Sequence, residues 1–288
     1  MGKILDDLVT LLSLEKIEEN LFRGQSQDLG WGNVFGGQVL GQALSAATQT
    51  TPPDREVHSL HAYFLRRGDA SKPIVYEVDR IRDGGSFTTR RVVATQSGAA
   101  IFNMAASFQK EEKGFEHQDA MPEVPPPEQV PTEQERFARA RDLVPKELFE
   151  RFAGEQAFEV RPVQVIDDLR HPSPMPPHRM VWFKTTGPLG DDQALHRYLL
   201  AYASDLGFLA TSMFPHGVTF FSGKVQVASL DHVMWFHAPL RADQWLLHVI
   251  DSPAARGSRG LVRGRVFTQD GRLVASTAQE GLIRKNHG

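Results

Sequence analysis

The chain has 288 residues, of which 41% are hydrophobic and 23% are charged, and its formal net charge is −3. This composition is typical of a globular protein with a hydrophobic core, and without a basic block neither nucleic acid nor an anionic membrane is expected as the main partner. Cysteine is absent, which excludes disulfides, thiolate metal sites and a cysteine nucleophile.

The first residues, MGKILDDLVTLLSLEKIEE, have apolar side chains at helical spacing, but Asp6, Asp7 and Glu15 interrupt them. A signal peptide has an unbroken apolar core, so we do not expect one here. No apolar run approaches the roughly 20 residues of a membrane-spanning helix. The last residues, KNHG, differ from the common peroxisomal tripeptide. We therefore expect a cytoplasmic protein without a membrane span.

The spacing of apolar residues in the first half predicts helices over 1–19 and 34–49, and strands over 20–24, 58–66, 73–83 and 86–109. The last segment turns back at Ser97-Gly98, which is a hairpin signal. The helix over 34–49, VFGGQVLGQALSAATQ, has almost no polar face. Other elements must therefore cover it on all sides.

Residues 110–135 are rich in proline and glutamate, which is typical of a linker. We expect residues 116–130 to make few contacts, because three consecutive prolines and many glutamates do not build a packed element. A short helix is expected over 133–152. The predicted organisation is a first unit over 1–115, a linker with a short helix over 116–150, and a second unit over 151–288.

The second half repeats the first, with a helix expected over 193–214 and strands over 180–186, 224–238, 245–252 and 258–284. The segment TQSGAAIFNMAAS (95–107) aligns with TQDGRLVASTAQE (268–280). In the same alignment of the two halves, SLHAYF (59–64) falls close to SLDHVMWF (229–236). The predicted fold class is α+β, with two repeats that each wrap an antiparallel sheet around a central helix. This is the description of a double hotdog.

Six segments carry a resemblance to a known family: LFRGQSQDLGWGNVFGGQVLGQAL, HSLHAYFLRRGD, RDGGSFTTRRV, SDLGFL, LDHVMWFH and TQDGRLVASTAQEG. Together they resemble the acyl-CoA thioesterase II family. The resemblance implies a double-hotdog enzyme that needs neither metal nor cofactor and hydrolyses fatty acyl-CoA thioesters. It also implies a catalytic set of an Asp, a Thr or Ser, and a Gln, which fall on Asp205, Ser229 and Gln279.

Asp205 is the most informative of these residues, because it is the only charged side chain between Tyr198 and Met213. Burying an unpaired charge in an apolar helix costs free energy, so a chance occurrence is not expected. Together with the resemblance, this favours a catalytic base over a structural cap or ion pair. Burial should raise the pKa of Asp205 and improve it as a base near neutral pH. Ser229 and Gln279 alone would be interpreted as an ordinary hydroxyl and an ordinary strand amide, so their assignment depends on the resemblance.

The start of the helix over 34–49 is a candidate oxyanion site. Backbone N–H groups near Gly37 and Gln38 would suit an oxyanion or a phosphate, although a tight turn explains the glycines equally well. Arg259 lies in a basic loop that is either a binding site for the CoA phosphates or a solvated loop. The histidines at 58, 61, 232 and 237 lack metal-ligand spacing, and we favour hydrogen bonding for them.

Three alternatives remain open from the sequence. Asp205 is either a general base for a water that Ser229 and Gln279 hold, or a nucleophile that forms an anhydride. An enoyl-CoA hydratase of hotdog type would need a G-D-x-N-P-x-H loop, but Gly68-Asp69 is followed by ASK. A non-catalytic acyl-CoA-binding protein would need none of the three residues. We also expect a homo-oligomer, either a dimer or a tetramer.

Overall fold

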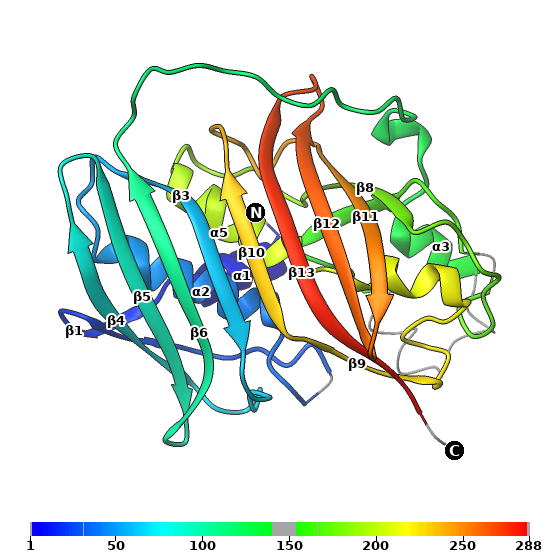
Figure 1. The fold of residues 1–288 in the computed structure, drawn as a ribbon, viewed down its shortest axis with the longest axis horizontal. Coiled ribbons are helices and arrows are strands. Elements are labelled where there is room, and N and C mark those ends of the chain that lie inside the picture. Colours follow the sequence, from blue (N-terminus) through cyan, green and yellow to red (C-terminus); the bar gives the residue numbers. More distant parts are fainter. Residues whose placement is uncertain (1, 31, 140–153, 167, 287–288) are drawn as a thin grey trace.

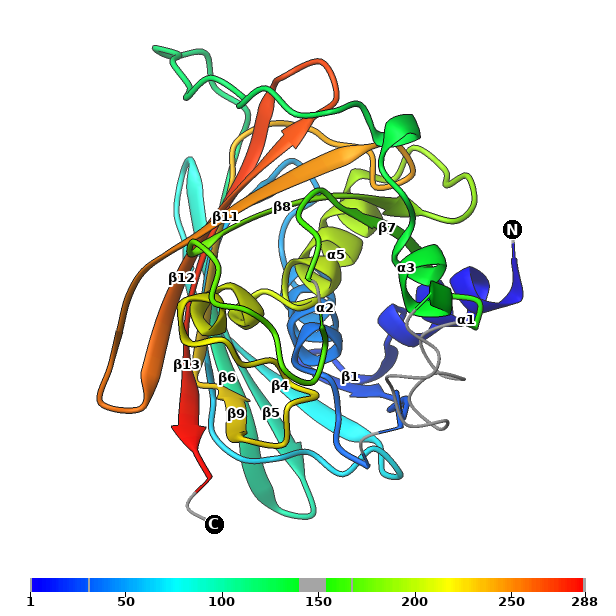
Figure 2. The same ribbon diagram turned by 90° about the vertical axis from the view of Figure 1, so that its right-hand side faces the viewer.

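The computed structural model describes residues 2–30, 32–139, 154–166 and 168–286. Within these residues, thirteen strands form a single antiparallel sheet that curls around two helices, α2 (Gly36–Gln49) and α5 (Gln193–Ser204). Figure 2 shows both helices inside the curve of the sheet. The predicted α+β class, with sheet wrapped around central helices, is confirmed.

The order of the strands is mirrored about the middle of the sheet: β1-β2-β4-β5-β6-β3 is followed by β10-β13-β12-β11-β8-β7, and β9 pairs with β13. The strands of the first half are β1 (Glu15–Glu18), β2 (Leu21–Gly24), β3 (Glu56–Phe64), β4 (Ile74–Asp83), β5 (Phe87–Gln96) and β6 (Ala99–Gln109). The strands of the second half are β7 (Phe158–Pro162), β8 (His178–Thr185), β9 (Val225–Ser229), β10 (Asp231–Phe236), β11 (Leu246–Arg256), β12 (Arg259–Thr268) and β13 (Leu273–Lys285).

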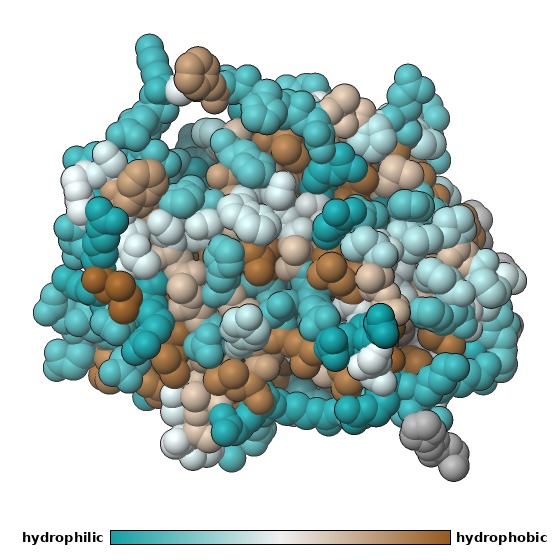
Figure 3. Space-filling model, in the orientation of Figure 1, coloured by the Kyte–Doolittle hydropathy of each residue, from teal (hydrophilic) through white to brown (hydrophobic). Residues whose placement is uncertain are grey.

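The two repeats join where β3 pairs with β10, at the centre of Figure 1. Leu60 lies opposite Met234, and both side chains are fully buried under the helices. Their neighbours alternate to the other face, where Tyr63 is 58% exposed and Trp235 is 39% exposed. Figure 3 shows that this outer face mixes polar side chains with scattered apolar ones. The two halves therefore share one continuous sheet.

Equivalent hairpins connect the last two strands of each repeat. Ser97 and Gly98, between β5 and β6, have φ angles of 50° and 79°. Positive φ at both central residues suits the twist of a tight hairpin. In the second repeat, Gly271 between β12 and β13 has a φ of 92°. The first hairpin was predicted from Ser97-Gly98.

The central helix α2 packs antiparallel against α5 and is buried along most of its length. A Cβ atom on Gly37 would lie 2.2 Å from the carbonyl oxygen of Tyr202, and one on Gly41 would lie 3.1 Å from that of Tyr198. Glycine at these positions therefore permits the close approach of the helices. At the other end of α2, the buried Arg90 donates hydrogen bonds to the carbonyl oxygen of Thr50 (2.9 Å).

The predicted helix over 1–19 is shorter than expected, because α1 (Lys3–Leu12) ends well before residue 19. Leu5, Leu8 and Leu12 bury its apolar face, and Ser13 then adopts an extended conformation. The residues beyond this point form the edge strand β1, which pairs with β2. The backbone hydrogen bonds of this pairing replace those of a longer helix.

The prediction of one helix over 193–214 is also wrong, because α5 ends at Ser204. Gly207 has a φ of 62°, which a right-handed helix does not accommodate, and its carbonyl oxygen accepts a hydrogen bond from Nη1 of Arg179 (2.7 Å). A separate 3₁₀ segment, η3 (Leu209–His216), follows. The predicted strand over 224–238 likewise divides at Leu230 into β9 and β10.

The linker runs in an extended conformation over one end of the sheet (Figure 1) and contacts the second repeat. Its side chains are exposed over residues 111–120, although Gln118 already donates to the carbonyl oxygen of Gly271 (2.8 Å). The prediction of few contacts is wrong further along, because Trp182 donates to the carbonyl oxygen of Pro125 (2.9 Å) and Val130 is buried against Trp182 and Leu247.

A short 3₁₀ turn, η1 (Pro127–Gln129), precedes the helix that was expected over 133–152. This helix begins as α3 (Glu133–Arg139), and residues 140–152 of the prediction lie outside the described residues. The unit boundaries at 115 and 151 remain predictions. None of the described helices combines the length and the apolar character required of a membrane span.

Candidate active site

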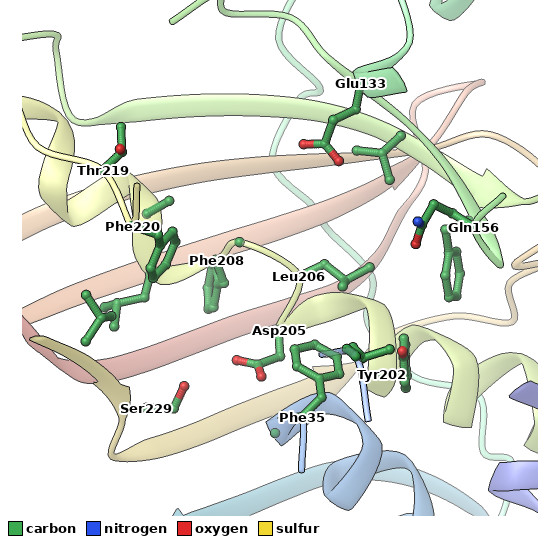
Figure 4. A pocket seen from close by; sticks show the side chains of 18 of the residues that line it. Phe35, Glu133, Gln156, Tyr202, Asp205, Leu206, Phe208, Thr219, Phe220 and Ser229 are labelled. Carbon is green, nitrogen blue, oxygen red and sulfur yellow. The ribbon is translucent and has the colours of Figure 1, made fainter. Parts of the chain in front are cut away.

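A cavity of ≈1630 Å³ lies between the central helices, the sheet and the segments that follow α5. Residues of both repeats line it, and Asp205, Ser229 and Gln279 all contribute to its wall. Figure 4 shows the carboxylate of Asp205 and the hydroxyl of Ser229 facing the same space. The structure thus brings together the three residues that the resemblance implied.

Asp205 is the C-cap residue of α5 and lies against the N-terminal end of α2. The backbone N–H of Gly37 and the side chains of Gln279 and Ser229 lie beside its carboxylate and lower its pKa as donors. A Cβ atom on Gly36 would lie only 2.6 Å from Oδ2 of Asp205. The carboxylate is therefore held between the end of its own helix and the positive end of α2.

Burial raises the pKa of Asp205 from 3.8 to about 7, because a charged carboxylate loses its hydration inside the protein. The hydrogen bonds from Gln279, Gly37 and Ser229 act in the opposite direction but do not cancel this effect. The accessible part of the side chain faces the cavity. A carboxylate with this pKa is suited to accept a proton near neutral pH.

Ser229 and Gln279 come from the neighbouring strands β9 and β13, which pair with Ser229 opposite Gly281. Nε2 of Gln279 donates to Oγ of Ser229 over 2.7 Å. The Ser229 hydroxyl therefore accepts from Gln279 and is free to donate its own hydrogen to the Asp205 carboxylate. These two groups and the Asp205 carboxylate form a polar cluster at the cavity wall, called the triangle below.

The buried His232 on β10 completes the polar cluster behind this triangle. Its Nδ1 lies 2.7 Å from Oε1 of Gln279, and its Nε2 lies 2.9 Å from Oγ of Ser204. Burial lowers the pKa of His232 to about 4, so the ring is neutral at ordinary pH. The sequence predicted hydrogen bonding for His232, but its contact with Gln279 depends on the register between β10 and β13, which local patterns do not contain.

The two other candidates at the start of α2 differ in their surroundings. The N–H of Gly37 faces the site and already donates to Asp205. The N–H of Gln38 donates to the carbonyl oxygen of Phe35 (3.1 Å). The side chain of Gln38 points elsewhere, since its Oε1 accepts from the backbone N–H of Gln27 (3.0 Å). Gly37 is thus the better placed of the two.

Arg259 is not among the described residues that line the cavity. It lies on the exposed side of β12, where its Nε forms an ion pair with Oε1 of Glu280 over 2.9 Å. His58 and His237 hydrogen-bond to Ser107 (2.8 Å) and Ser276 (2.9 Å), as the sequence suggested. Within the described residues, no three His, Asp or Glu side chains are arranged to hold a metal ion.

Two family models match the chain, "Acyl-CoA thioesterase N-terminal domain" over residues 26–109 and "Acyl-CoA thioesterase" over residues 147–282. The acyl-CoA thioesterase 2 of Haemophilus influenzae is 46% identical over 284 residues, which cover 99% of each chain. The chain belongs to the acyl-CoA thioesterase II family. Its resemblance to this family, predicted from six short segments, is confirmed.

Solved structures of similar proteins agree with this assignment. An acyl-CoA thioesterase II from Mycobacterium marinum is 44% identical, with a TM-score of 0.79 over 98% of this chain and 99% of the other. A hot dog fold protein of unknown function from Alicyclobacillus acidocaldarius is 21% identical, with a TM-score of 0.77 over 98% of this chain and 99% of the other. This acyl-CoA thioesterase family member therefore has the predicted double-hotdog fold.

Proposed function

We propose that the protein hydrolyses fatty acyl-CoA thioesters to a free fatty acid and CoA, with Asp205 as the general base. One observation carries the proposal: a carboxylate with a pKa raised to about 7 faces a large cavity, in contact with the amide of Gln279 and the hydroxyl of Ser229. Membership of the acyl-CoA thioesterase family supports acyl-CoA as the substrate.

In the proposed reaction, Ser229 and Gln279 hold a water beside the carboxylate of Asp205 and direct it toward the thioester carbonyl. Asp205 takes a proton from this water while its oxygen bonds to the carbonyl carbon. The resulting oxyanion is stabilised by the backbone N–H of Gly37, which turns from the Asp205 carboxylate to the oxyanion as Asp205 takes up the proton. Collapse of this intermediate breaks the carbon–sulfur bond, and the thiolate of CoA takes the proton that Asp205 received.

The decisive test measures thiol release from palmitoyl-CoA and acetyl-CoA. Asp205→Asn keeps the shape of the side chain but removes the base, so kcat should fall by roughly 100-fold or more, while KM changes little. Asp231→Asn is a matched control, because burial also raises the pKa of this carboxylate, but it accepts a bond from the backbone N–H of Glu280 instead. A folded and fully active Asp205→Asn variant would exclude the proposed base.

The roles of the other two residues are tested by combining substitutions. Ser229→Ala and Gln279→Ala should each reduce kcat less than Asp205→Asn, because each removes one hydrogen bond to the water. Either one combined with Asp205→Asn should cost less than the sum of the separate effects, since all three groups act on one water. Strict additivity would indicate independent roles.

The alternative in which Asp205 attacks the carbonyl and forms an anhydride makes a different isotopic prediction. A single turnover in ¹⁸O-labelled water would place label in the carboxylate of Asp205 if water attacks the anhydride at that carbon. Direct attack of water on the substrate would leave Asp205 unlabelled. Label in the peptide that contains Asp205, detected by mass spectrometry, would therefore establish the anhydride route.

The proposal includes a cytoplasmic location, a role in lipid metabolism and assembly into a dimer or a tetramer. The exposed aromatic side chains of Tyr63 and Trp235 on the outer face of the central strands support self-association. Light scattering on the purified protein tests the assembly. A mass equal to a single chain at micromolar concentration would exclude it.

A further inference from the structure

The cavity reaches the surface near two groups of residues that differ in charge. One group follows β3, where the exposed Arg66 and Arg67 line the cavity. The other lies near α1, α3 and the segment before β7, where the lining includes the carboxylates of Asp7, Glu133 and Glu155 together with Arg136 and Arg179. Between the two groups lies Asp205, with its predicted partners.

The Arg66–Arg67 end is the one beside Ser229. The backbone N–H of Phe64, at the end of β3, donates to the carbonyl oxygen of Leu230 over 2.9 Å. Leu230 directly follows Ser229, so the chain passes the site only a few residues before the two arginines. A molecule that enters here meets Ser229 before it reaches the interior of the cavity.

The backbone that carries these arginines is held firmly on two sides. The N–H groups of Leu65 and Arg66 both donate to the carbonyl oxygen of Ile101. The carbonyl oxygen of Gly68 accepts from Val34 in the segment before α2 (2.9 Å). Two adjacent cationic side chains are therefore presented on a fixed loop, which lowers the entropic cost of binding.

The charge of both arginines is uncompensated. Nη1 of Arg66 donates to the carbonyl oxygen of Ala100 (2.6 Å), and no carboxylate of the described chain pairs with it. Arg67 forms no hydrogen bond or ion pair with any described residue. By contrast, Arg259, Arg263 and Arg265 on β12 each form an ion pair with a carboxylate. A free guanidinium at a cavity mouth attracts and binds phosphate.

We propose that the nucleotide phosphates of CoA bind at Arg66 and Arg67, and that the acyl chain extends past Asp205 toward α1 and α3. The inference rests on the proposed acyl-CoA hydrolysis. Apolar side chains of Phe158 and Val160 line the part of the cavity near α3 and suit an alkyl chain. The arginines at that end, Arg136 and Arg179, interact with Glu133, so their charge is compensated and they attract phosphate less than Arg66 and Arg67 do.

The test compares octanoyl-CoA with octanoyl-pantetheine, which has the same thioester but no nucleotide. Arg67→Ala should raise KM for octanoyl-CoA roughly threefold to fivefold, and Arg67→Glu about tenfold, because the contact is exposed. Neither variant should change KM for octanoyl-pantetheine, or kcat for either substrate. The difference between the substrates should shrink at high salt. Arg259→Ala is the matched control and should leave both substrates unaffected.

Each outcome has a clear meaning. Equal KM changes for both substrates, or none, in the Arg67 variants would overturn the inference while wild-type activity upheld the proposed hydrolysis. A specific effect of Arg259→Ala on octanoyl-CoA would place the phosphates at β12 instead. A wild-type protein that hydrolyses neither substrate would contradict the proposed function itself.

Discussion

His232 and Gln279 contact each other across the paired strands β10 and β13, with 2.7 Å between Nδ1 and Oε1. An amide oxygen only accepts hydrogen bonds, so Nδ1 of the neutral His232 carries the proton. This bond fixes which end of the Gln279 amide faces the cavity. Its Nε2, the donor to Ser229 and Asp205, is thereby kept on the side of the proposed water.

We therefore predict that His232 positions Gln279 in the reaction. His232→Leu keeps an apolar volume but loses the donor, so kcat should fall about tenfold with little change in KM. His232→Asn places an amide N–H near the former Nδ1 and should restore most of the rate. Melting temperatures of both variants provide the control. Equal rates for the two variants at equal stability would show that the donor has no role.

The raised pKa of Asp205 predicts how the rate depends on pH. The base acts in its ionised form, so kcat/KM should be constant above pH 7 and fall about tenfold per unit below it. His232, with a pKa of about 4, stays neutral in this range and does not alter the slope. Rates measured between pH 5 and pH 9 check this. A rate that is flat down to pH 5 would exclude a base with the raised pKa.

The same shift predicts a gain of stability on substitution. The pKa of Asp205 is higher in the folded protein, about 7, than its ordinary 3.8, so its contribution to stability is full below pH 3.8 and is lost as pH rises to 7. The Asp205→Asn variant does not ionise at this position, so it does not lose this contribution to stability as the pH rises. The melting temperature of the variant should exceed that of wild type at pH 8, and the difference should shrink toward pH 4. A less stable variant at pH 8 would indicate a structural carboxylate.

The two glycines that open α2 should differ in the consequences of substitution. Gly37→Ala places Cβ 2.2 Å from the backbone oxygen of Tyr202, so we expect a loss of roughly 1–3 kcal/mol of stability. Gly36→Ala meets Oδ2 of Asp205 at 2.6 Å and should reduce kcat more than stability. Gly85→Ala, with nothing within 4 Å of the new atom, is the control. Melting temperature and kcat of each variant separate the effects.

Chelation provides a fifth prediction. The proposed chemistry uses only the carboxylate, hydroxyl and amide of the site, and Asp205 is activated by burial instead of by a cation. Activity should therefore survive dialysis against EDTA within the error of the assay. Loss of activity that a divalent ion restores would reveal a metal-dependent step.

The sequence alone predicted those helices and strands whose apolar residues recur with a regular helical or strand spacing. Most strands, the hairpin at Ser97-Gly98 and the core of α2 were predicted because alternation, a Ser-Gly pair and an apolar helix are local signals. Asp205 stood out because a lone charge among apolar residues is unusual. The end of α5 was missed because an apolar pattern continues through η3, and only the positive φ of Gly207 interrupts the helix.

Other features depend on partners distant in the sequence. β7 was not predicted, because its five residues form a strand by pairing with β8. The linker is held against the second repeat by the packing of Val130 on Trp182, and no local sequence pattern predicts this contact. The contact of His232 with Gln279 spans 47 positions and follows from strand register alone. These contacts belong to the tertiary structure and are absent from any short window of sequence.

The mirrored strand order gives the two central helices corresponding C-terminal ends, at the C-cap Asp205 of α5 and at the C-cap Thr50 of α2. At one end Asp205 faces the cavity with a raised pKa. At the other, a hydrogen bond from Arg90 lowers the pKa of Asp83, which becomes half of an ion pair beside Thr50. A carboxylate thus caps only one of these two helices, so the proposed chemistry predicts a single reaction centre per chain in any assembly.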